Sequence, residues 1–331
     1  MKALADLLQV AADLRQHPWK MEVVANAMPE KIELLARVAE VPLFTWTPFG
    51  DWPPEPTAQV GILADNSRNK WGVCGNRTGK TETIIFEDIC DSWLLDPLLR
   101  GPSNRWLDSH GNLEESIGTW CVSDTEETSV MICQKKVADL LGPETGMGWE
   151  LVKDSSHYEM ESGFKGNSIQ FVNNSYITFK FSSQKRKAFQ GTAMHKIHLD
   201  EEPPQDIYSE CYARTIDYGG RIAGTFTPVY DRKRGISWIF DELYNKPEKN
   251  VSWHNWSLFD NPHLSENAKA ELINEWEEDE RDVRAYGMFT PMGVKPAMAR
   301  DLLAEAEKSV IAPREGYFMF NKNGTTEFVE H

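Results

Sequence analysis

Two spacings of apolar residues along the chain separate the predicted helices from the predicted strands. Between residues 3 and 16 apolar residues stand at positions 4, 7, 8, 11 and 14, a helical spacing that predicts an amphipathic helix, and residues 29–38 also predict a helix. The segment 45–56 then carries repeated tryptophans and prolines, and the prolines exclude regular structure. We therefore expect an N-terminal helical extension, residues 1–55, that ends at a domain boundary.

After this boundary, short apolar runs alternate with helical patterns. Strands are predicted at residues 71–74 and 117–122, and each is followed by a helix, at 80–93 and at 126–141. Because strand, turn and helix in alternation are typical of βαβ units, we predict an α/β fold with a mostly parallel central sheet flanked by helices. Later elements are a hairpin over residues 168–181, strands at 196–199, 222–226 and 251–256, and one long charged helix from Ser265, as its N-cap, to Tyr286.

The predicted main domain covers residues 56–290, and residues 291–331 form a short C-terminal tail. Within the tail, residues 297–309 have a helical pattern, and residues 317–329 predict a small hairpin around Asn323-Gly324. We expect this tail to be a docking element or a remnant.

The composition excludes several classes of protein. Hydrophobic residues make up 40% of the chain and charged residues 26%, which is ordinary for a globular protein. No apolar run approaches the roughly 20 residues that cross a bilayer, and Asp6 interrupts the N-terminus before a secretory signal forms. We therefore expect a cytoplasmic protein without membrane contact. The five cysteines include no C-x-x-C pair, so neither a disulfide framework nor a zinc site is predicted.

The net charge of −16 argues against a protein that coats nucleic acid over its whole surface. Any contact with DNA has to be local. Three consecutive basic residues, Arg232, Lys233 and Arg234, are the candidates for binding DNA phosphates, and a solvated turn is the alternative interpretation. No pattern indicates a recognition helix or a zinc module, so we expect DNA binding without sequence specificity.

The segment 74–81, Cys-Gly-Asn-Arg-Thr-Gly-Lys-Thr, lies between a predicted strand and a predicted helix, which is the context of a phosphate-binding loop. Backbone N–H groups of such a loop bind phosphates, Lys80 places a cation on the terminal phosphates, and Thr81 offers a hydroxyl to Mg²⁺. The strict pattern has glycine where this chain has Cys74, and an ordinary helix N-terminus is the alternative. The candidate nucleotide contacts are Gly75, Asn76, Arg77, Thr78, Gly79, Lys80 and Thr81.

A second motif supports the loop. The apolar run 197–199 ends in Asp200, which could hold Mg²⁺, and Glu201, which could orient or deprotonate an attacking water. Alone, these carboxylates are better interpreted as a solvated turn, but with the loop they predict a site for Mg²⁺ and ATP hydrolysis. At the end of a third strand, Thr225 or Thr227 could bind the γ-phosphate or the water, although a plain strand stopped by proline explains them too.

Together, in this order, the motifs resemble the ATPase domain of the large terminase subunit, the DNA-packaging motor of tailed bacteriophages. Residues 75–82 are similar to the family's variant phosphate loop, which tolerates loss of the first glycine and often carries an arginine. The resemblance covers roughly residues 45–290. Its other segments are Phe189–Thr192 with Ile197–Pro203, the coupling motif Thr225–Pro228, and Asn261–Leu264 with Arg284–Gly287 at the end of the ATPase region.

The resemblance implies a P-loop NTPase of the additional-strand, conserved-glutamate type. It implies a motor that hydrolyses ATP and moves double-stranded DNA into a procapsid, in the host cell cytoplasm. Its partners would be the portal protein, the terminase small subunit and other copies of the chain in a ring, usually of five subunits, although the isolated chain could be a monomer. It further implies that Gln59 contacts adenine and that an arginine acts in trans on a neighbour's γ-phosphate. Arg186 is our candidate and Arg77 the runner-up, with plain surface charge as the alternative for both.

The chain departs from the family after Gly287. A large terminase carries there a nuclease domain of ribonuclease H type that needs several metal-binding aspartates, whereas residues 288–331 contain only Asp301. We therefore expect no nuclease activity. Two other functions stay open: a P-loop helicase or other nucleic-acid-remodelling ATPase, and a non-enzymatic assembly protein with a structural nucleotide site. The helicase is disfavoured because we find no second phosphate loop.

Overall fold

The computed structural model describes most of the central chain. Outside the described residues lie the two helices predicted before residue 41, the helix predicted at 297–309, and the basic cluster Arg232, Lys233 and Arg234. The chain divides into two units, residues 1–292 and residues 293–331. The described residues are 41–98, 103, 105–107, 111–112, 114–229, 237–289, 316–320 and 326–330.

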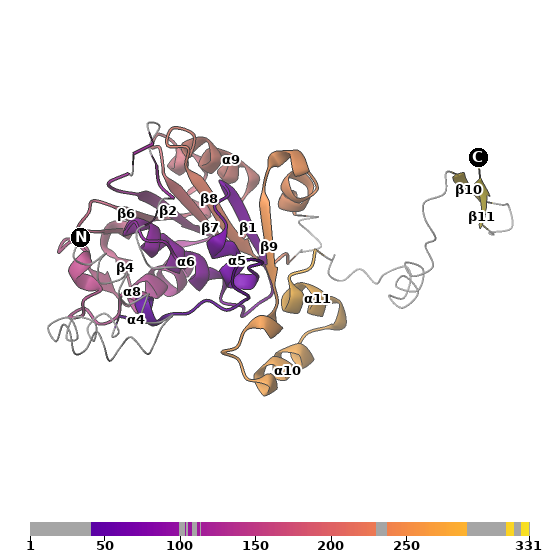
Figure 1. The fold of residues 1–331 in the computed structure, drawn as a ribbon, viewed down its shortest axis with the longest axis horizontal. Coiled ribbons are helices and arrows are strands. Elements are labelled where there is room, and N and C mark those ends of the chain that lie inside the picture. The colour runs from indigo at the N-terminus through magenta and orange to yellow at the C-terminus, as the bar shows by residue number, and fades with distance from the viewer. Residues whose placement is uncertain are drawn as a thin grey trace. The chain divides into compact units, whose positions relative to one another are not determined.

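A seven-stranded sheet forms the centre of the first unit, with the strand order β5-β6-β2-β7-β8-β1-β9 (Figure 1). All neighbouring strands are parallel except β5 and β6, which form the predicted hairpin. Every residue of β1, β2 and β7 is buried, as in parallel sheets that are covered on both faces. The strands are β1 Asn69–Cys74, β2 Gly118–Ser123, β5 Ser168–Gln170, β6 Tyr176–Phe181, β7 Lys196–Asp200, β8 Arg221–Phe226 and β9 Ser252–Trp256.

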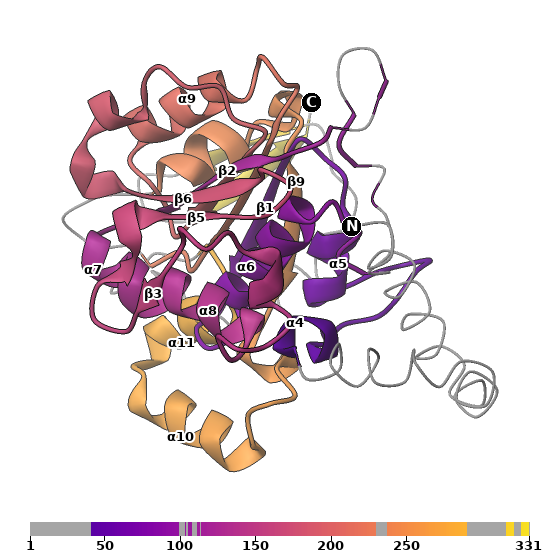
Figure 2. The same cartoon turned by 90° about the vertical axis from the view of Figure 1, so that its left-hand side faces the viewer.

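Helices cover both faces of the sheet (Figures 1 and 2). The helices α5 Ala58–Ala64, α6 Lys80–Ser92 and α8 Lys135–Leu141 bury apolar side chains in one cluster, to which the short α4 Pro42–Thr45 adds Leu43 and Phe44. On the second face, α9 Gln205–Arg214 packs Ile207, Tyr208 and Cys211 into a separate cluster. Within the described residues, every helix is too short or too polar to span a lipid bilayer.

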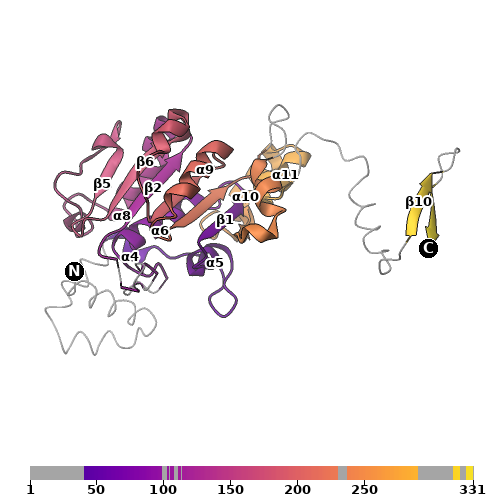
Figure 3. The same ribbon diagram turned by 90° about the horizontal axis from the view of Figure 1, so that it is seen from above.

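The prediction of one long charged helix from Ser265 to Tyr286 is wrong in one respect, because the helix is interrupted near residue 276. Ser265 caps it as expected, accepting a hydrogen bond from the Ala268 N–H at 3.2 Å, but the chain forms two helices, α10 Glu266–Glu275 and α11 Glu278–Tyr286. Between them, Trp276 has extended backbone and Glu277 is also non-helical. Arg281 donates from Nε to the carbonyls of Ile273 and Trp276, and so satisfies acceptors that the break leaves open. Figure 3 shows both helices at the β1 end of the sheet, away from β5.

The helix predicted at 126–141 is confirmed, with an irregularity inside it. It consists of α7 Glu126–Thr128, the π-helical turn η2 Ser129–Gln134, and α8. Turns of this kind occur often at functional sites. Shorter elements connect the core: η3 Trp149–Leu151, β3 Tyr158–Glu159, β4 Gly163–Phe164, η4 Lys165–Asn167, η5 Ser182–Gln184, η6 Arg186–Phe189, η7 Phe240–Tyr244, η8 Pro247–Lys249 and η9 Leu258–Asp260.

The second unit contains the antiparallel pair β10 Gly316–Phe320 and β11 Thr326–Glu330, which confirms the predicted C-terminal hairpin. Its expected turn, Asn323-Gly324, lies outside the described residues.

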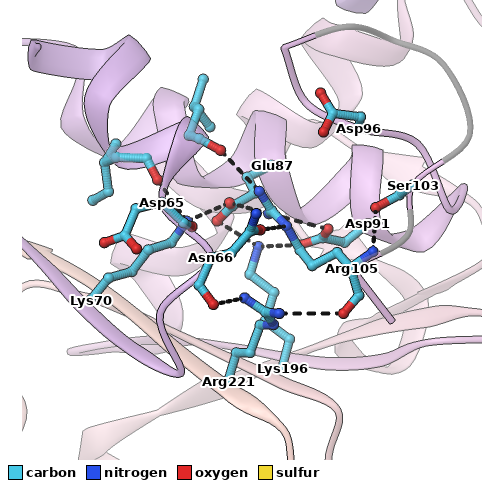
Figure 4. A network of polar contacts seen from close by, with 12 residues as sticks. Asp65, Asn66, Lys70, Glu87, Asp91, Asp96, Ser103, Arg105, Lys196 and Arg221 are labelled. Atoms are coloured by element: carbon cyan, nitrogen blue, oxygen red, sulfur yellow. Dashed lines mark hydrogen bonds and ion pairs between the residues drawn. The ribbon is translucent and has the colours of Figure 1, made fainter. Parts of the chain in front are cut away.

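Charged side chains form a buried network between α6 and the amino-terminal ends of the strands (Figure 4). The Lys196 ammonium lies 3.0 Å from Glu87, 2.9 Å from Asp88 and 2.8 Å from Asp91, and Lys70 lies 2.6 Å from Glu87. Burial acts to raise the pKa of Glu87, but the surrounding cations outweigh it and hold that pKa well below its usual range. Since a buried charge without its partner is costly, the network fixes the position of α6.

We expect Lys196→Met to lower the free energy of unfolding by about 3–5 kcal/mol, because three buried carboxylates lose their shared cation. Guanidinium denaturation measures this loss. Lys135→Met is the matched control: its ammonium pairs with Asp139 on the exposed face of α8, so the cost should be about 0.5 kcal/mol or less. Equal losses in the two variants would contradict the importance of the network.

Candidate functional site

The loop between β1 and α6 lies at the carboxyl edge of the sheet. Arg77 and Gly79 have left-handed backbone, with φ of 59° and 72°, and Gly79 is the N-cap of α6. A left-handed residue next to a right-handed one turns successive N–H groups to one side, which forms a concavity for anions. The first N–H groups of α6 and the positive end of its dipole add to this attraction. The loop therefore suits a phosphate group.

The structure brings the loop and the acidic strand together. Lys80 Nζ lies 2.9 Å from Glu201 Oε1. The Thr81 hydroxyl donates to Asp200 Oδ1 at 2.6 Å, although the two residues lie 119 positions apart in the sequence. Asp200 is the last residue of β7. A cation, a hydroxyl and two carboxylates thus converge at the mouth of the loop.

Glu201 has an unusual conformation for its residue type. Its φ of 70° lies in the left-handed region that favours glycine, which is a strain often found at functional positions. Its Oε2 accepts a hydrogen bond from the Thr227 N–H at 3.1 Å. Partial burial raises the pKa of Glu201, whose side chain is 48% exposed, and the charge of Asp200 acts in the same direction, while Lys80 acts in the opposite one. A carboxylate with a raised pKa is a better proton acceptor near neutral pH.

Lys80 stays cationic in this setting. Burial acts to lower the pKa of its ammonium, but the negative charges of Glu201 and Asp200 outweigh that effect and raise the pKa. The loop therefore presents a fixed positive charge toward any bound anion.

Of the two candidate threonines, Thr227 reaches the loop. Its hydroxyl lies 3.1 Å from Asn76 Oδ1, so Thr227 links Asn76 in the loop to Glu201. Thr225 is fully buried inside β8, and its hydroxyl has no hydrogen-bond partner among the described residues. Thr225 therefore stays within the sheet, whereas Thr227, just after the end of β8, contacts the loop.

The remaining candidates, Gln59, Arg77 and Arg186, differ in their burial and in their contacts. The Gln59 side chain is buried against the loop: its Oε1 accepts from the Phe49 N–H at 3.2 Å, and its Nε2 donates to the Thr78 carbonyl at 3.4 Å. The Arg77 side chain is exposed. Arg186 is also exposed, and its Nε donates to Glu210 Oε1 on α9 at 2.8 Å.

The sequence did not predict one further contact to Asp200. Cys133, in the π-helical turn η2, lies with its sulfur 3.5 Å from Asp200 Oδ2, so both carboxylate oxygens of Asp200 have a partner. A lone cysteine in an amphipathic pattern looks like any other core residue. Only the tertiary structure places it beside the carboxylate.

A separate cluster could hold a metal ion by its residue types. Ligand atoms of Asp88, Cys121 and His198, all buried, lie within 4.8 Å of one another, and the described residues include no other such group. However, Asp88 already pairs with the Lys196 ammonium at 2.9 Å and with His198 Nδ1 at 2.7 Å. Since Lys196 supplies the positive charge, we interpret the cluster as part of the buried network.

The end of α11 packs tightly on the loop. The Asn76 N–H donates to the Arg284 carbonyl at 2.6 Å, and a Cβ on Gly75 would lie 2.3 Å from the Ala285 carbonyl oxygen. A Cβ on Gly287 would likewise lie 2.6 Å from the carbonyl carbon of Cys74. Gly75 and Gly287 are therefore required for this close approach, which the sequence motifs alone did not indicate.

Several known proteins are similar to this chain in sequence or in fold. The family model described as "Terminase large subunit, T4likevirus-type, N-terminal" matches residues 72–295. The terminase large subunit of Salmonella phage P22 is 36% identical over 112 residues, which are 34% of this chain and 22% of that protein. The large terminase of the thermophilic bacteriophage D6E (crystal form 2) has a TM-score of 0.54 at 15% identity, covering 74% of this chain and 54% of that one.

A second structure of the D6E protein, in complex with ADP, has a TM-score of 0.52 at 15% identity and covers 70% of this chain and 52% of that chain. The chain thus spans about half the length of the D6E protein, and its match to the P22 protein covers about a fifth of that protein. The structural likeness confirms the predicted P-loop α/β fold with its mostly parallel sheet.

Proposed function

The chain belongs to the terminase large subunit family, and on that premise we propose that it is the ATP-hydrolysing motor subunit of a phage DNA-packaging terminase. One observation carries the proposal. At a loop built for phosphate, Lys80 meets Glu201 at 2.9 Å and Thr81 meets Asp200 at 2.6 Å. A cation, a metal-binding oxygen pair and a base are the groups that phosphoryl transfer to water requires.

Each of these residues has a distinct role in the proposal. The loop N–H groups and Lys80 bind the phosphates of ATP. The hydroxyl of Thr81 and the carboxylate of Asp200 are oxygen donors of the kind that Mg²⁺ prefers, so they would hold it. When bound, Mg²⁺ neutralises charge on the phosphate oxygens. Glu201 orients the attacking water and accepts its proton.

The ion pair between Lys80 and Glu201 suggests how the binding of ATP could free Glu201 to act on the attacking water. Without nucleotide, the two side chains hold each other. The phosphates of ATP carry more negative charge than one carboxylate, so they compete for the Lys80 ammonium. Glu201 is then released toward the water, while the Thr227 N–H keeps one of its oxygens in place. The Thr227 hydroxyl also contacts Asn76 in the loop. Hydrolysis of the γ-phosphate can therefore be transmitted through the loop and Thr227 to the end of β8.

The partners belong to the same proposal. We infer that the chain acts in the host cytoplasm as a ring, of five copies, on the portal protein, together with the small subunit and double-stranded DNA. A chain with a net charge of −16 contacts DNA only locally, for which Arg232, Lys233 and Arg234 remain our candidates.

Phosphate release from Mg-ATP tests the proposed function when it is measured with linear double-stranded DNA, with single-stranded DNA and without DNA. We expect the duplex to raise turnover most, and Lys80→Ala to remove it. Stimulation by single strands alone would favour a helicase-like ATPase. ATP binding without turnover under all three conditions would favour a structural nucleotide site.

A further inference from the structure

Two exposed aromatic rings lie together on segments that contact the loop. The ring centroids of Phe259 and Tyr286 are 5.3 Å apart, and their planes meet at 34°. Phe259 is 41% exposed and Tyr286 is 42% exposed. Large aromatic side chains usually bury their faces, so a half-exposed pair beside a binding loop offers a surface for a flat apolar ligand.

Both segments that carry the rings are fastened to the loop. Two residues after Phe259, the Asn261 side chain donates to the Arg77 carbonyl at 2.7 Å. The Asn255 side chain donates to the carbonyls of Val73 and Tyr286, at 2.6 and 3.0 Å, and so ties the end of β1 to the end of α11. The backbone segments that carry the two rings are therefore held beside the loop.

Gln59, the residue expected to contact adenine, leaves the base without a stacking surface. Its amide is buried and already engaged with backbone groups of Phe49 and Thr78, which braces the loop. An amide could at most recognise the edge of a base. The flat faces of a purine need aromatic or apolar partners, which Phe259 and Tyr286 provide.

We propose that Phe259 and Tyr286 form the platform on which the purine base of the nucleotide stacks. The inference rests on the proposed function, since it assumes that the loop binds the phosphates of the same molecule. Stacking on an aromatic face depends little on which base is present, because every base has such a face. The platform therefore supplies affinity for nucleotides over bare polyphosphate, rather than a choice between adenine and guanine.

Calorimetric titration of the full chain with Mg-ADP and with Mg-pyrophosphate separates the two parts of the site. We expect the double variant Phe259→Ala/Tyr286→Ala to weaken ADP binding about 5- to 100-fold and to leave pyrophosphate binding unchanged. The variant Phe259→Tyr/Tyr286→Phe, which keeps both aromatic faces, should bind ADP like the parent. Tyr212→Ala is the matched control, because Tyr212 is 45% exposed on α9, on the second face of the sheet.

Several results would overturn the platform. The first is equally tight binding of ADP by the parent and the double variant. The double variant could lose ADP and pyrophosphate binding together, which would mean that the rings support the loop instead of the base. If the parent bound neither ADP nor pyrophosphate, both the proposed function and the platform would fail. If the parent bound both ligands but the double variant bound ADP equally well, only the platform would fail.

Discussion

Glu201→Gln should lower the rate of ATP hydrolysis by about 10²–10⁴-fold, because the amide cannot accept a proton from water. Glutamine has the same shape and can still accept the hydrogen bond from the Thr227 N–H. Its neutral side chain no longer competes for Lys80, so Mg-ATP should bind as tightly as in the parent or more tightly. Phosphate release and equilibrium binding, measured on the same preparation, check both expectations.

Glu202→Gln is the matched control for this variant. Glu202 is the next residue, and its carboxylate bonds to Ser237 instead of facing the loop, so its turnover should stay within about twofold of the parent. In the parent, turnover should fall on acidification at a pH above the ordinary range of a glutamate, because the pKa of Glu201 is raised and protonation removes the base. Equal turnover in Glu201→Gln and the parent would exclude Glu201 as the base.

Arg186→Ala should lower turnover of the assembled protein by about 10³-fold while ATP binding is retained, if its guanidinium stabilises charge on a neighbour's γ-phosphate. In the single chain this arginine is 57% exposed and pairs with Glu210. A neighbouring subunit's phosphates would draw it away from that carboxylate. Lys187→Ala, at the adjacent exposed position, is the control and should keep its activity.

Mixing the two inactive variants tests whether the arginine acts in trans. A Glu201→Gln chain supplies an intact Arg186 to its neighbour, and an Arg186→Ala chain supplies an intact Glu201 in its own site. The mixture should therefore recover part of the parent's turnover, although neither variant does so alone. A mixture that stays as inactive as its components would rule out Arg186 as the arginine that acts in trans.

The sequence predicted the secondary structure around the candidate site residues, because that structure depends on local pattern. The residues from Cys74 to Thr81 lie between a strand and a helix, and Asp200 ends an apolar strand. The sequence around each motif was therefore sufficient to predict whether the motif lies on a strand, a loop or a helix. The order of the parallel strands then placed both motifs at the same edge of the sheet. The contact between Thr81 and Asp200 follows from that topology.

The features that the sequence did not predict depend on contacts between distant segments. The break after Glu275 has no proline or glycine to mark it, and carbonyls there are satisfied by Arg281 from the following helix. Either Thr225 or Thr227 fitted the strand pattern, and only the end of β8 at Phe226 determines which hydroxyl reaches the loop. The close approach of Gly75 to α11 likewise exists only in the folded chain.

The most direct test of the central claim is the rate of phosphate release from Mg-ATP at increasing concentrations of the chain, with Glu201→Gln measured in parallel. We expect turnover per chain to rise with concentration, because a neighbour completes each site, and to fall by about 10²–10⁴-fold in the variant. Phosphate release that Glu201→Gln leaves unchanged would contradict the claim that this loop and this acidic strand form the hydrolytic site.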